Sequence, residues 1–356
     1  MGAFIVKYLH FLNTHRSFYM RSNYSAWTVA TDAYDQATSN DEKLKHLLRL
    51  ALLAPSANNS QPWKVHVEKD TIIIRPNPQR ILPISDNNQR QLHISLGCLL
   101  EHLLIAADYY GYVPQVKILT EDSTTITVFI GEEQKSHGGD DHLVHSFFKR
   151  STNRGKYRGP VSESLLQRLK QDTAKPADII FISESEQKQK LAKISVAATI
   201  FAMSNPEFRK ELSGYIKSNI TSSGVGIPVF GMFVPTLLSL FIPYIVKYIN
   251  IGKKNAKRDL ELLTTHTPVI ALLCTPTDDT DNWIHSGRVY ARIALLATRE
   301  GMTTGMSTAS IQMGSFFKEL QEVVRTKDRP QAFFRLGYPT KIPHHSPRLS
   351  LEEVLQ

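Results

Sequence analysis

Two stretches of this 356-residue chain, residues 97–112 and 287–302, align without a gap. Each begins with glycine and carries a second glycine fourteen residues later. Both are rich in Ala, Leu and Ile, so each predicts a helix with a nearly continuous apolar surface and a central position. The first glycine lets another backbone approach closely, and the second supplies a left-handed helix C-cap. The shared frame predicts an internal repeat, although two unrelated Ala- and Leu-rich helices are the simpler alternative.

Other segments follow the same order in both halves of the chain. Strand candidates at residues 71–75 and 268–274 precede the two central helices, and further helices are predicted at residues 43–54 and 187–203. The simplest arrangement is a duplicated α+β unit whose two halves face each other as the two chains of a dimer would. The predicted boundaries are an N-terminal arm (1–40), a first half (41–140) and a second half (141–356) with an insert (218–258).

The segment APSANNSQPW, residues 54–63, connects a predicted helix to a predicted strand. Pro55 ends the helix because it lacks a backbone N–H and restrains the residue before it. Ser56, Asn58 and Gln61 carry short polar side chains, and the amides offer both donors and acceptors. A well-capped turn uses the same residues. The segment is therefore either a structural turn or part of a site for a heterocyclic ligand.

A short basic segment, residues 147–157, opens the second half and contains Arg150, Thr152 and Arg154. Guanidinium groups offer paired donors to phosphate oxygens, and a hydroxyl group can add another. The alternative is a solvated basic loop before a helix predicted at residues 162–171.

These segments resemble motifs of the nitroreductase family. APSANNSQPW is similar to the family's "APSxxNxQPW" signature, residues 147–157 to its "RRSxRxF" motif, and residues 335–339 with 347–354 to its C-terminal "lGYP...pR.pleevv". The resemblance implies a nitroreductase-like α+β fold. Two pseudo-symmetric repeats in one chain would mimic the family's dimer, with an apolar lid insert, as in the tandem Acg-like branch.

The resemblance also implies a site for flavin mononucleotide (FMN). Arg150, Thr152, Arg154 and Arg348 would hold its phosphate, ribityl chain and pyrimidine edge, while Ser346 stands where the family commonly has a lysine. Arg154 would stabilise negative charge on the reduced flavin, and Ser307 would lie near N5 of the ring. Because each motif occurs once, one intact site and one degenerate site are expected. The full expected set of cofactor-binding residues is Pro55, Ser56, Asn58, Gln61, Arg150, Thr152, Arg154, Ser307 and Arg348.

Two functions follow from this resemblance. The first is an FMN-dependent oxidoreductase that passes hydride from NAD(P)H to a small nitroaromatic or quinone-type electron acceptor. No dedicated catalytic side chain is required, because the cofactor carries the chemistry. The alternative is a protein that stores FMN under a closed lid and has little or no reductase turnover.

The insert has no charged residue between Ser218 and Lys247. Its length and composition suit a membrane span, but Pro228, Pro235 and Pro243 interrupt it, and lipid cannot replace the backbone donors that they remove. A lid over the ligand site is the favoured interpretation. The other interpretation is peripheral membrane contact through residues 225–251.

Composition restricts the remaining possibilities. The net charge is +9, but the basic residues are scattered and accompany no nucleic-acid-binding motif, so no nucleic acid partner is expected. Cys98 and Cys274 stand apart in apolar sequence, which favours core thiols in a reducing compartment over a disulfide or a metal site. Residues 1–25 lack a signal-peptide pattern and predict a short amphipathic arm. A cytoplasmic monomer, internally a pseudo-dimer, is expected.

Overall fold

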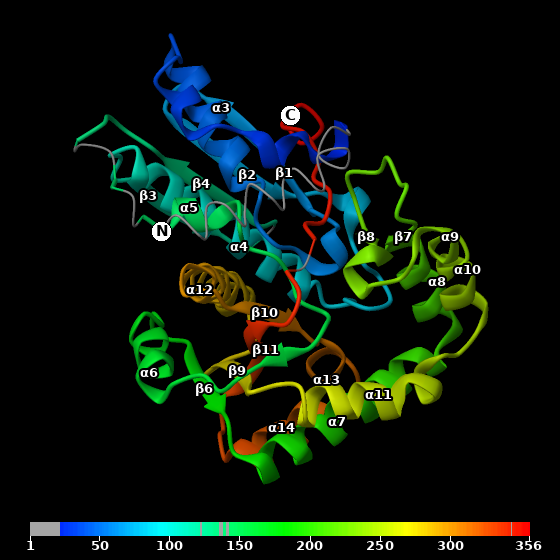
Figure 1. The fold of residues 1–356 in the computed structure, drawn as a ribbon. Helices are drawn as coiled ribbons and strands as arrows, with labels where there is room; N and C mark the ends of the chain where they lie inside the picture. The colour runs from blue at the N-terminus through cyan, green and yellow to red at the C-terminus, as the bar shows by residue number, and fades with distance from the viewer. Residues whose placement is uncertain (1–21, 122, 135–137, 140–141, 343) are drawn as a thin grey trace.

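The chain forms two antiparallel sheets on either side of a pair of central helices (Figure 1). The computed structural model describes residues 22–121, 123–134, 138–139, 142–342 and 344–356. The mixed helix and strand content confirms the expected α+β class. In the described residues the helices are α3 (Asn40–Ala51), α4 (Arg90–Tyr109), α5 (Val144–Phe147), α6 (Glu163–Gln171), α7 (Ser185–Ser204), α8 (Pro206–Tyr215), α9 (Thr236–Ser239), α10 (Ile242–Tyr248), α11 (Gly252–Thr264), α12 (Thr280–Arg299), α13 (Ala309–Gln312) and α14 (Phe316–Val324).

The first sheet belongs to the first half of the chain, and the second sheet to the second half. The order is β1-β2-β4-β3 in the first and β10-β11-β9-β6 in the second, with β5 paired to β11. β9 is buried along its whole length, as its unbroken apolar run requires. The strands of these sheets are β1 (Trp63–Glu68), β2 (Thr71–Pro76), β3 (Gln115–Leu119), β4 (Thr125–Phe129), β5 (Tyr157–Arg158), β6 (Asp178–Ile182), β9 (Val269–Thr275), β10 (Thr303–Met306) and β11 (Arg329–Pro339).

The central helices α4 and α12 cross at the two glycines that the alignment equates. A Cβ atom on Gly97 would lie 1.9 Å from the carbonyl oxygen of Ile284, and one on Gly287 would lie 2.0 Å from that of Ile94. These contacts are reciprocal, because position 94 aligns with 284 just as 97 aligns with 287. The expected close backbone approach is therefore present. The glycines lie within the helices, however, and not at their starts, because each helix begins seven residues earlier.

The second glycine of each stretch ends its helix as expected. Gly111 and Gly301 have φ angles of 83° and 78°. The N–H of the next residue then donates back to the helix in the same pattern, Tyr112 to Ala107 at 3.0 Å and Met302 to Ala297 at 2.8 Å. The repeat itself stays a prediction, and this shared geometry supports it.

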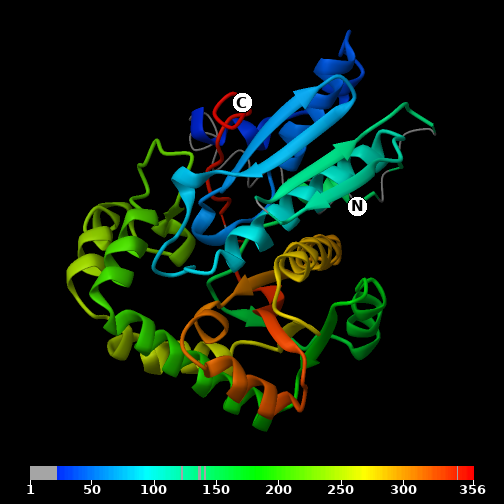
Figure 2. The same ribbon diagram turned by 180° about the vertical axis from the view of Figure 1, so that it is seen from behind.

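Both ends of the described chain pack on the first half. Residues 1–21 of the predicted arm lie outside the described residues; within residues 22–40, Tyr24, Trp27 and Tyr34 lie buried in the core. At the other end, Val65 on β1 exchanges backbone hydrogen bonds with Val354 and Gln356, both at 2.9 Å. Figure 2 shows this C-terminal segment running from the second half onto the first. A site built by both halves can thus include residues from the C-terminus.

The insert folds as short elements at one side of the molecule. These are β8 (Ile227–Pro228), paired with β7 (Ile216–Lys217), the 3-10 helix η5 (Val229–Met232), α9, α10 and α11. Pro235 is the N-cap residue of α9, which contains four residues, and Pro243 lies in the first turn of α10, which contains seven. Among the described residues, the one helix long and apolar enough to cross a membrane is α4, which is a buried core helix. The insert itself is therefore not a single span.

Candidate functional site

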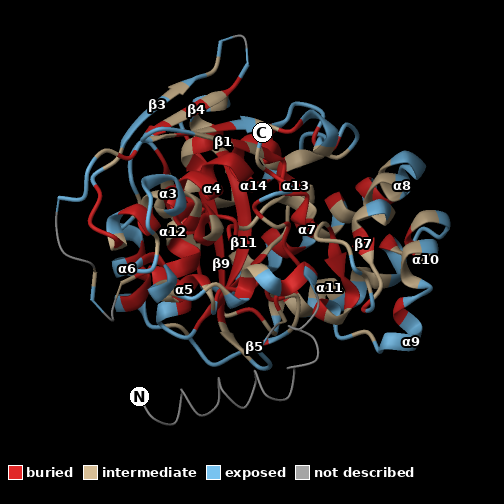
Figure 3. Ribbon diagram, turned by 90° about the horizontal axis from the view of Figure 1, so that it is seen from above, coloured by how far each residue is buried: buried red, intermediate tan, exposed pale blue. Residues whose placement is uncertain are grey.

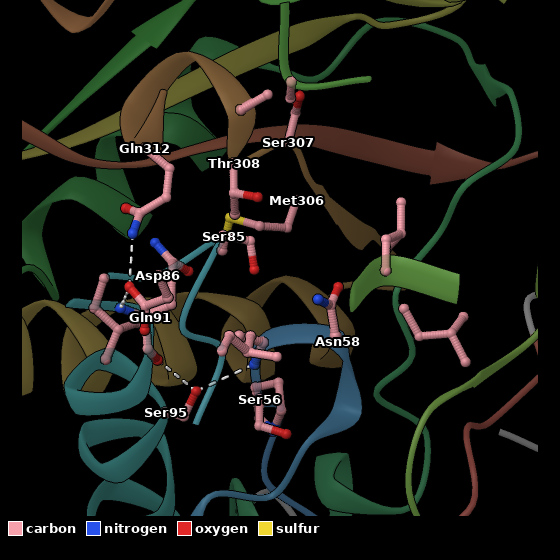
Figure 4. A pocket seen from close by; sticks show the side chains of 18 of the residues that line it. Ser56, Asn58, Ser85, Asp86, Gln91, Ser95, Met306, Ser307, Thr308 and Gln312 are labelled. Atoms are coloured by element: carbon pink, nitrogen blue, oxygen red, sulfur yellow. Dashed lines mark hydrogen bonds between the residues drawn. The ribbon is translucent and has the colours of Figure 1, made fainter. Parts of the chain in front are cut away.

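A cavity of about 330 Å³ lies between the two halves (Figure 4). A smaller cavity of about 40 Å³ adjoins it, since Pro55, Ser56, Thr152 and Arg154 line both. We call them the main cavity and the arginine cavity. Asn58 and Ser307 also line the main cavity, while Arg150 and Arg348 line the arginine cavity. The structure thus brings together eight of the nine cofactor-binding residues expected from the sequence.

The loop between α3 and β1 holds an unusual backbone conformation. Asn58, Asn59 and Gln61 have φ angles of 49°, 52° and 49°. Asparagine tolerates this left-handed region better than most residues, whereas glutamine rarely adopts it. The N–H of Ala57 donates to Ser95 Oγ at 3.1 Å, and the N–H of Gln61 donates to Ser56 Oγ at 3.0 Å. These bonds fix the loop beside the main cavity, into which Figure 4 shows Asn58 projecting.

Gln61 is the one expected site residue that lines neither of these two cavities. Its side chain is fully buried, and Nε2 donates to the carbonyl of Gly224 at 2.8 Å. Its Oε1 accepts from the N–H of Leu349 at 3.0 Å. The amide therefore ties the insert and the C-terminal segment to the loop. Gln61 therefore stabilises the loop that lines the cavities.

The arginine cavity contains two deeply buried cations. Arg150 and Arg348 are 4% and 3% exposed, and both donate to the carbonyl of Leu53, at 3.4 and 3.1 Å. Leu53 follows the C-terminal end of α3, where the helix dipole is negative. The arginine ion pairs that the structure gives in its described residues involve other positions. The Nε atoms of both Arg150 and Arg348 are buried without a hydrogen-bond partner.

The electrostatics of this cavity favour an anion. Burial lowers the pKa of Arg150, and burial together with the nearby Arg150 lowers the pKa of Arg348 well below its ordinary value. Both shifts mean that the buried positive charges are poorly compensated. An anion bound between these guanidinium groups would supply the missing charge and accept from the free Nε–H groups.

Arg154 stands where the two cavities meet. Burial lowers its pKa to about 10, with Tyr290 opposing and Arg335 reinforcing the shift, so the guanidinium stays positive at neutral pH. A Cβ atom on Gly231 of the insert would lie 3.7 Å from its Nη1. The insert thus covers this arginine on one side.

Arg335 on β11 holds the basic segment in position. It donates to the carbonyls of Asn153 and Gly155, both at 2.9 Å, and the N–H of Asn153 donates to the carbonyl of Thr304 on β10 at 2.8 Å. The segment is therefore anchored to the second sheet, while Arg150 reaches the carbonyl of Leu53 in the first half.

Other cavity residues were not predicted from the sequence. Trp27 and His345 line the arginine cavity and stack with ring centroids 4.0 Å apart, and Arg348 lies 4.8 Å from the Trp27 ring. Tyr290 on α12 lines the main cavity, and its hydroxyl lies 3.0 Å from Thr304 Oγ1. No motif marks these residues. Their aromatic or titratable side chains are the one property in the sequence that could have suggested a role in the site.

Ser307 lines the main cavity from the second half. Its N–H donates to the carbonyl of Phe333 at 2.9 Å and is therefore not available to a ligand. Its hydroxyl lies 3.0 Å from Ser195 Oγ. Apolar side chains from α7, α8 and β8 form another part of the wall: Ala202, Met203, Phe208, Leu212 and Ile227. The joined cavities suit an elongated ligand with an anionic end and a larger, mixed polar and apolar end.

No protein-family model matches the chain. An uncharacterised protein of Mycobacterium tuberculosis H37Rv, Rv3127, is 26% identical over 325 residues, covering 88% of this chain and 92% of that protein. "Putative NAD(P)H nitroreductase acg" of the same strain is 21% identical over 319 residues, covering 87% and 94%. "Putative NAD(P)H nitroreductase Rv3131" is 24% identical over 327 residues, covering 88% of each chain.

The FMN and NADPH-dependent nitroreductase NfnB of Sphigopyxis sp. strain HMH covers 60% of this chain and 97% of its own, at 15% identity and a TM-score of 0.41. Iodotyrosine deiodinase bound to FMN and 3-iodo-L-tyrosine covers 58% and 95%, at 14% identity and a TM-score of 0.38.

Proposed function

We propose, from the premise that this chain belongs to the nitroreductase family of oxidoreductases, that it binds one FMN in the joined cavities and uses NAD(P)H to reduce a small acceptor. The observation that carries the proposal is the cluster of Arg150, Arg154 and Arg348 at one end of a cavity between the halves. Buried cations whose ion pairs with carboxylates are absent from the described part of the chain fit a phosphate group.

The residues present divide the work of holding FMN. Arg150 and Arg348 would hold the phosphate, with Thr152 beside them, because they line the arginine cavity. Arg154 would place a positive charge where the two cavities join, and Ser56 and Asn58 would offer hydrogen bonds to polar edges in the main cavity. Bound FMN would supply the hydride chemistry. The apolar wall from α7, α8 and β8 would exclude water and favour a flat, weakly polar acceptor such as a nitroaromatic or quinone.

The tandem arrangement belongs to the same proposal. The basic segment occurs once, and the region that the repeat places opposite it, residues 22–40, has no such cluster. One intact site for each chain is the arrangement that follows, with the insert as a lid beside Arg154.

Removal of one arginine tests the cofactor assignment. Arg150→Ala should weaken FMN binding at least about 100-fold, the scale of losing a buried charged partner. The same variant should leave the melting temperature of the FMN-free protein unchanged or higher, because an uncompensated buried charge is removed. Flavin absorbance after purification, titration with FMN and thermal unfolding measure these effects.

Arg158→Ala, at an exposed arginine of β5, is the matched control and should retain FMN. Undiminished flavin content in Arg150→Ala would refute the assignment. Anaerobic mixing of the flavin-loaded protein with NADH or NADPH tests turnover: rapid bleaching supports the oxidoreductase, whereas reduction by dithionite alone would support flavin storage.

A further inference from the structure

The insert exposes a dense group of large apolar side chains. Leu237 is 80% exposed, and Phe241, Tyr244 and Tyr248 are 62%, 66% and 68% exposed. We call the group the lid patch; with its less exposed members it comprises Leu237, Leu238, Leu240, Phe241, Tyr244, Tyr248 and Ile249. Figure 3 shows α9 and α10 at the rim of the molecule, away from the buried centre. Contiguous exposed apolar groups on a soluble surface mark a binding face.

The segment that carries the lid patch is firmly folded. Ile242 and Val234 pack against a small core of Ile216, Ile227 and Val229. The Oγ of Ser239 accepts from the N–H of Asn219 at 3.0 Å, and Asn219 Nδ2 donates to the carbonyl of Val234 at 2.9 Å. This small core and these hydrogen bonds hold the segment in place without the side chains of the lid patch, which are exposed to solvent.

The charged residues that adjoin the lid patch in the chain are mostly positive. Residues 212–258 contain six Lys or Arg residues and no Asp or Glu. Four of them, Lys253, Lys254, Lys257 and Arg258, are exposed on α11, directly after the lid patch in the chain. α11 also carries Glu261 and Asp259, which lies 3.3 Å from Arg258, so its four cations outnumber its two carboxylates. Apolar side chains beside an excess of cations complement a bilayer that carries anionic headgroups.

We propose that the lid patch docks on the surface of an anionic membrane, with its Leu, Phe and Tyr side chains at the level of the headgroups and the α11 cations on lipid phosphates. α9 and α10 are too short to span a bilayer, so the contact is peripheral. α10 packs on α8, whose Phe208 and Leu212 line the main cavity. Docking therefore brings the apolar wall of that cavity close to the lipid. The proposal does not depend on FMN binding.

Vesicle binding by the full-length protein tests this surface. Sedimentation with vesicles of phosphatidylcholine and phosphatidylglycerol should retain the protein, with binding that weakens as salt rises, whereas phosphatidylcholine alone should retain far less. Leu237→Ser with Phe241→Ser, and separately Lys253→Glu with Lys254→Glu, should each lower the partition coefficient roughly tenfold or more.

Matched double variants provide the controls. Leu119→Ser with Phe129→Ser replaces the same residue types at exposed positions of the first sheet, and Lys117→Glu with Lys318→Glu reverses two exposed charges away from the insert. Both should bind vesicles like the unaltered protein, and thermal unfolding should show all four variants folded. Equal vesicle binding by the lid-patch variants and their controls would overturn the proposal. So would a dimer in vesicle-free solution that Leu237→Ser with Phe241→Ser dissociates, because the lid patch would then seat a second copy.

Discussion

Two buried histidines, His46 and His345, are held in the neutral form. His46 packs inside the first half with Nε2 3.0 Å from the hydroxyl of Tyr110, and burial, helped by Arg49, lowers its pKa to about 4. Burial and the cations of Arg150 and Arg348 lower the pKa of His345 to about 3. Each ring binds a proton more readily in the unfolded chain than in the folded one.

The free energy of unfolding should therefore fall as the pH falls. A histidine whose pKa is lowered by folding contributes its full stabilisation above about pH 6.5, and this stabilisation is lost as the pH falls to the pKa of the folded state. For His46 the loss of unfolding free energy is about 3 kcal/mol. Chemical denaturation at pH 7 and at pH 4.5 measures the change. His46→Gln should show a smaller loss between these two values; an unchanged loss would contradict the assignment.

Most of the candidate site could be predicted from the resemblance of its segments to nitroreductase-family motifs, whereas residue type alone left a structural turn and a solvated basic loop as alternatives. Gln61 could not, since the partners of its amide are Gly224 and Leu349, which are remote in the sequence. Trp27 and His345 could not either, because their stacking depends on where two distant segments meet.

At the scale of elements, the crossing of α4 and α12 depends on two missing side chains. A methyl group on either Gly97 or Gly287 would sit about 2 Å from a backbone carbonyl of the opposite helix. The backbone of the opposite helix, unlike the end of a flexible side chain, cannot rotate away from the added methyl group. The two helices would have to separate along an interface that is otherwise closely packed.

Gly287→Ala should accordingly lower the free energy of unfolding by more than about 3 kcal/mol, the upper part of the range for overpacked cores. Gly214→Ala is the matched control, because this glycine lies in α8 with nothing within 4 Å of the added methyl group. The control should be neutral or slightly stabilising, since alanine favours helix. Equal effects in urea denaturation would mean that the close approach is not present in solution.

The middle and the end of each central helix could be predicted, but not its start. Apolar periodicity fades in the first turns, which carry polar residues such as Gln91 and Asn282. α4 begins where it does because Asp86 accepts from the N–H groups of Gln91 and Leu92, both at 2.9 Å. α3 likewise begins earlier than expected, at a capping box formed by Ser39 and Glu42.

Across the whole molecule, the two halves are also joined by an ion pair that occurs on one side only. Glu101 on α4 contacts Arg288 at 3.0 Å and Arg292 at 2.6 Å on α12. Position 101 aligns with Ala291, so the opposite side has no carboxylate at this place. The order of elements could be predicted, yet the paths of the chain ends could not, because residues 22–34 and 344–356 pack across the predicted boundaries.

One FMN for each chain, in a monomer, is the expected state of the purified protein if the proposed function holds. The reason is that a single basic segment faces a single copy of the α3–β1 loop between the halves. Flavin absorbance against protein concentration, together with the mass in solution, measures both quantities. Two flavins for each chain would contradict the single intact site, and a flavin that binds only to a dimer would contradict its location within one chain.

The crossing of the central helices has a consequence for how such a molecule can evolve. In a dimer of identical chains, each contact across the two-fold interface occurs twice, so a substitution that changes it on one side also changes it on the other. Within a single chain, position 97 and position 287 are inherited separately. Each glycine must be retained separately, because a side chain at either position would clash with a different backbone carbonyl. The polar groups around the two glycines are free to diverge. Glu101 can therefore pair with two arginines on one side of the crossing, while the aligned position on the other side is alanine.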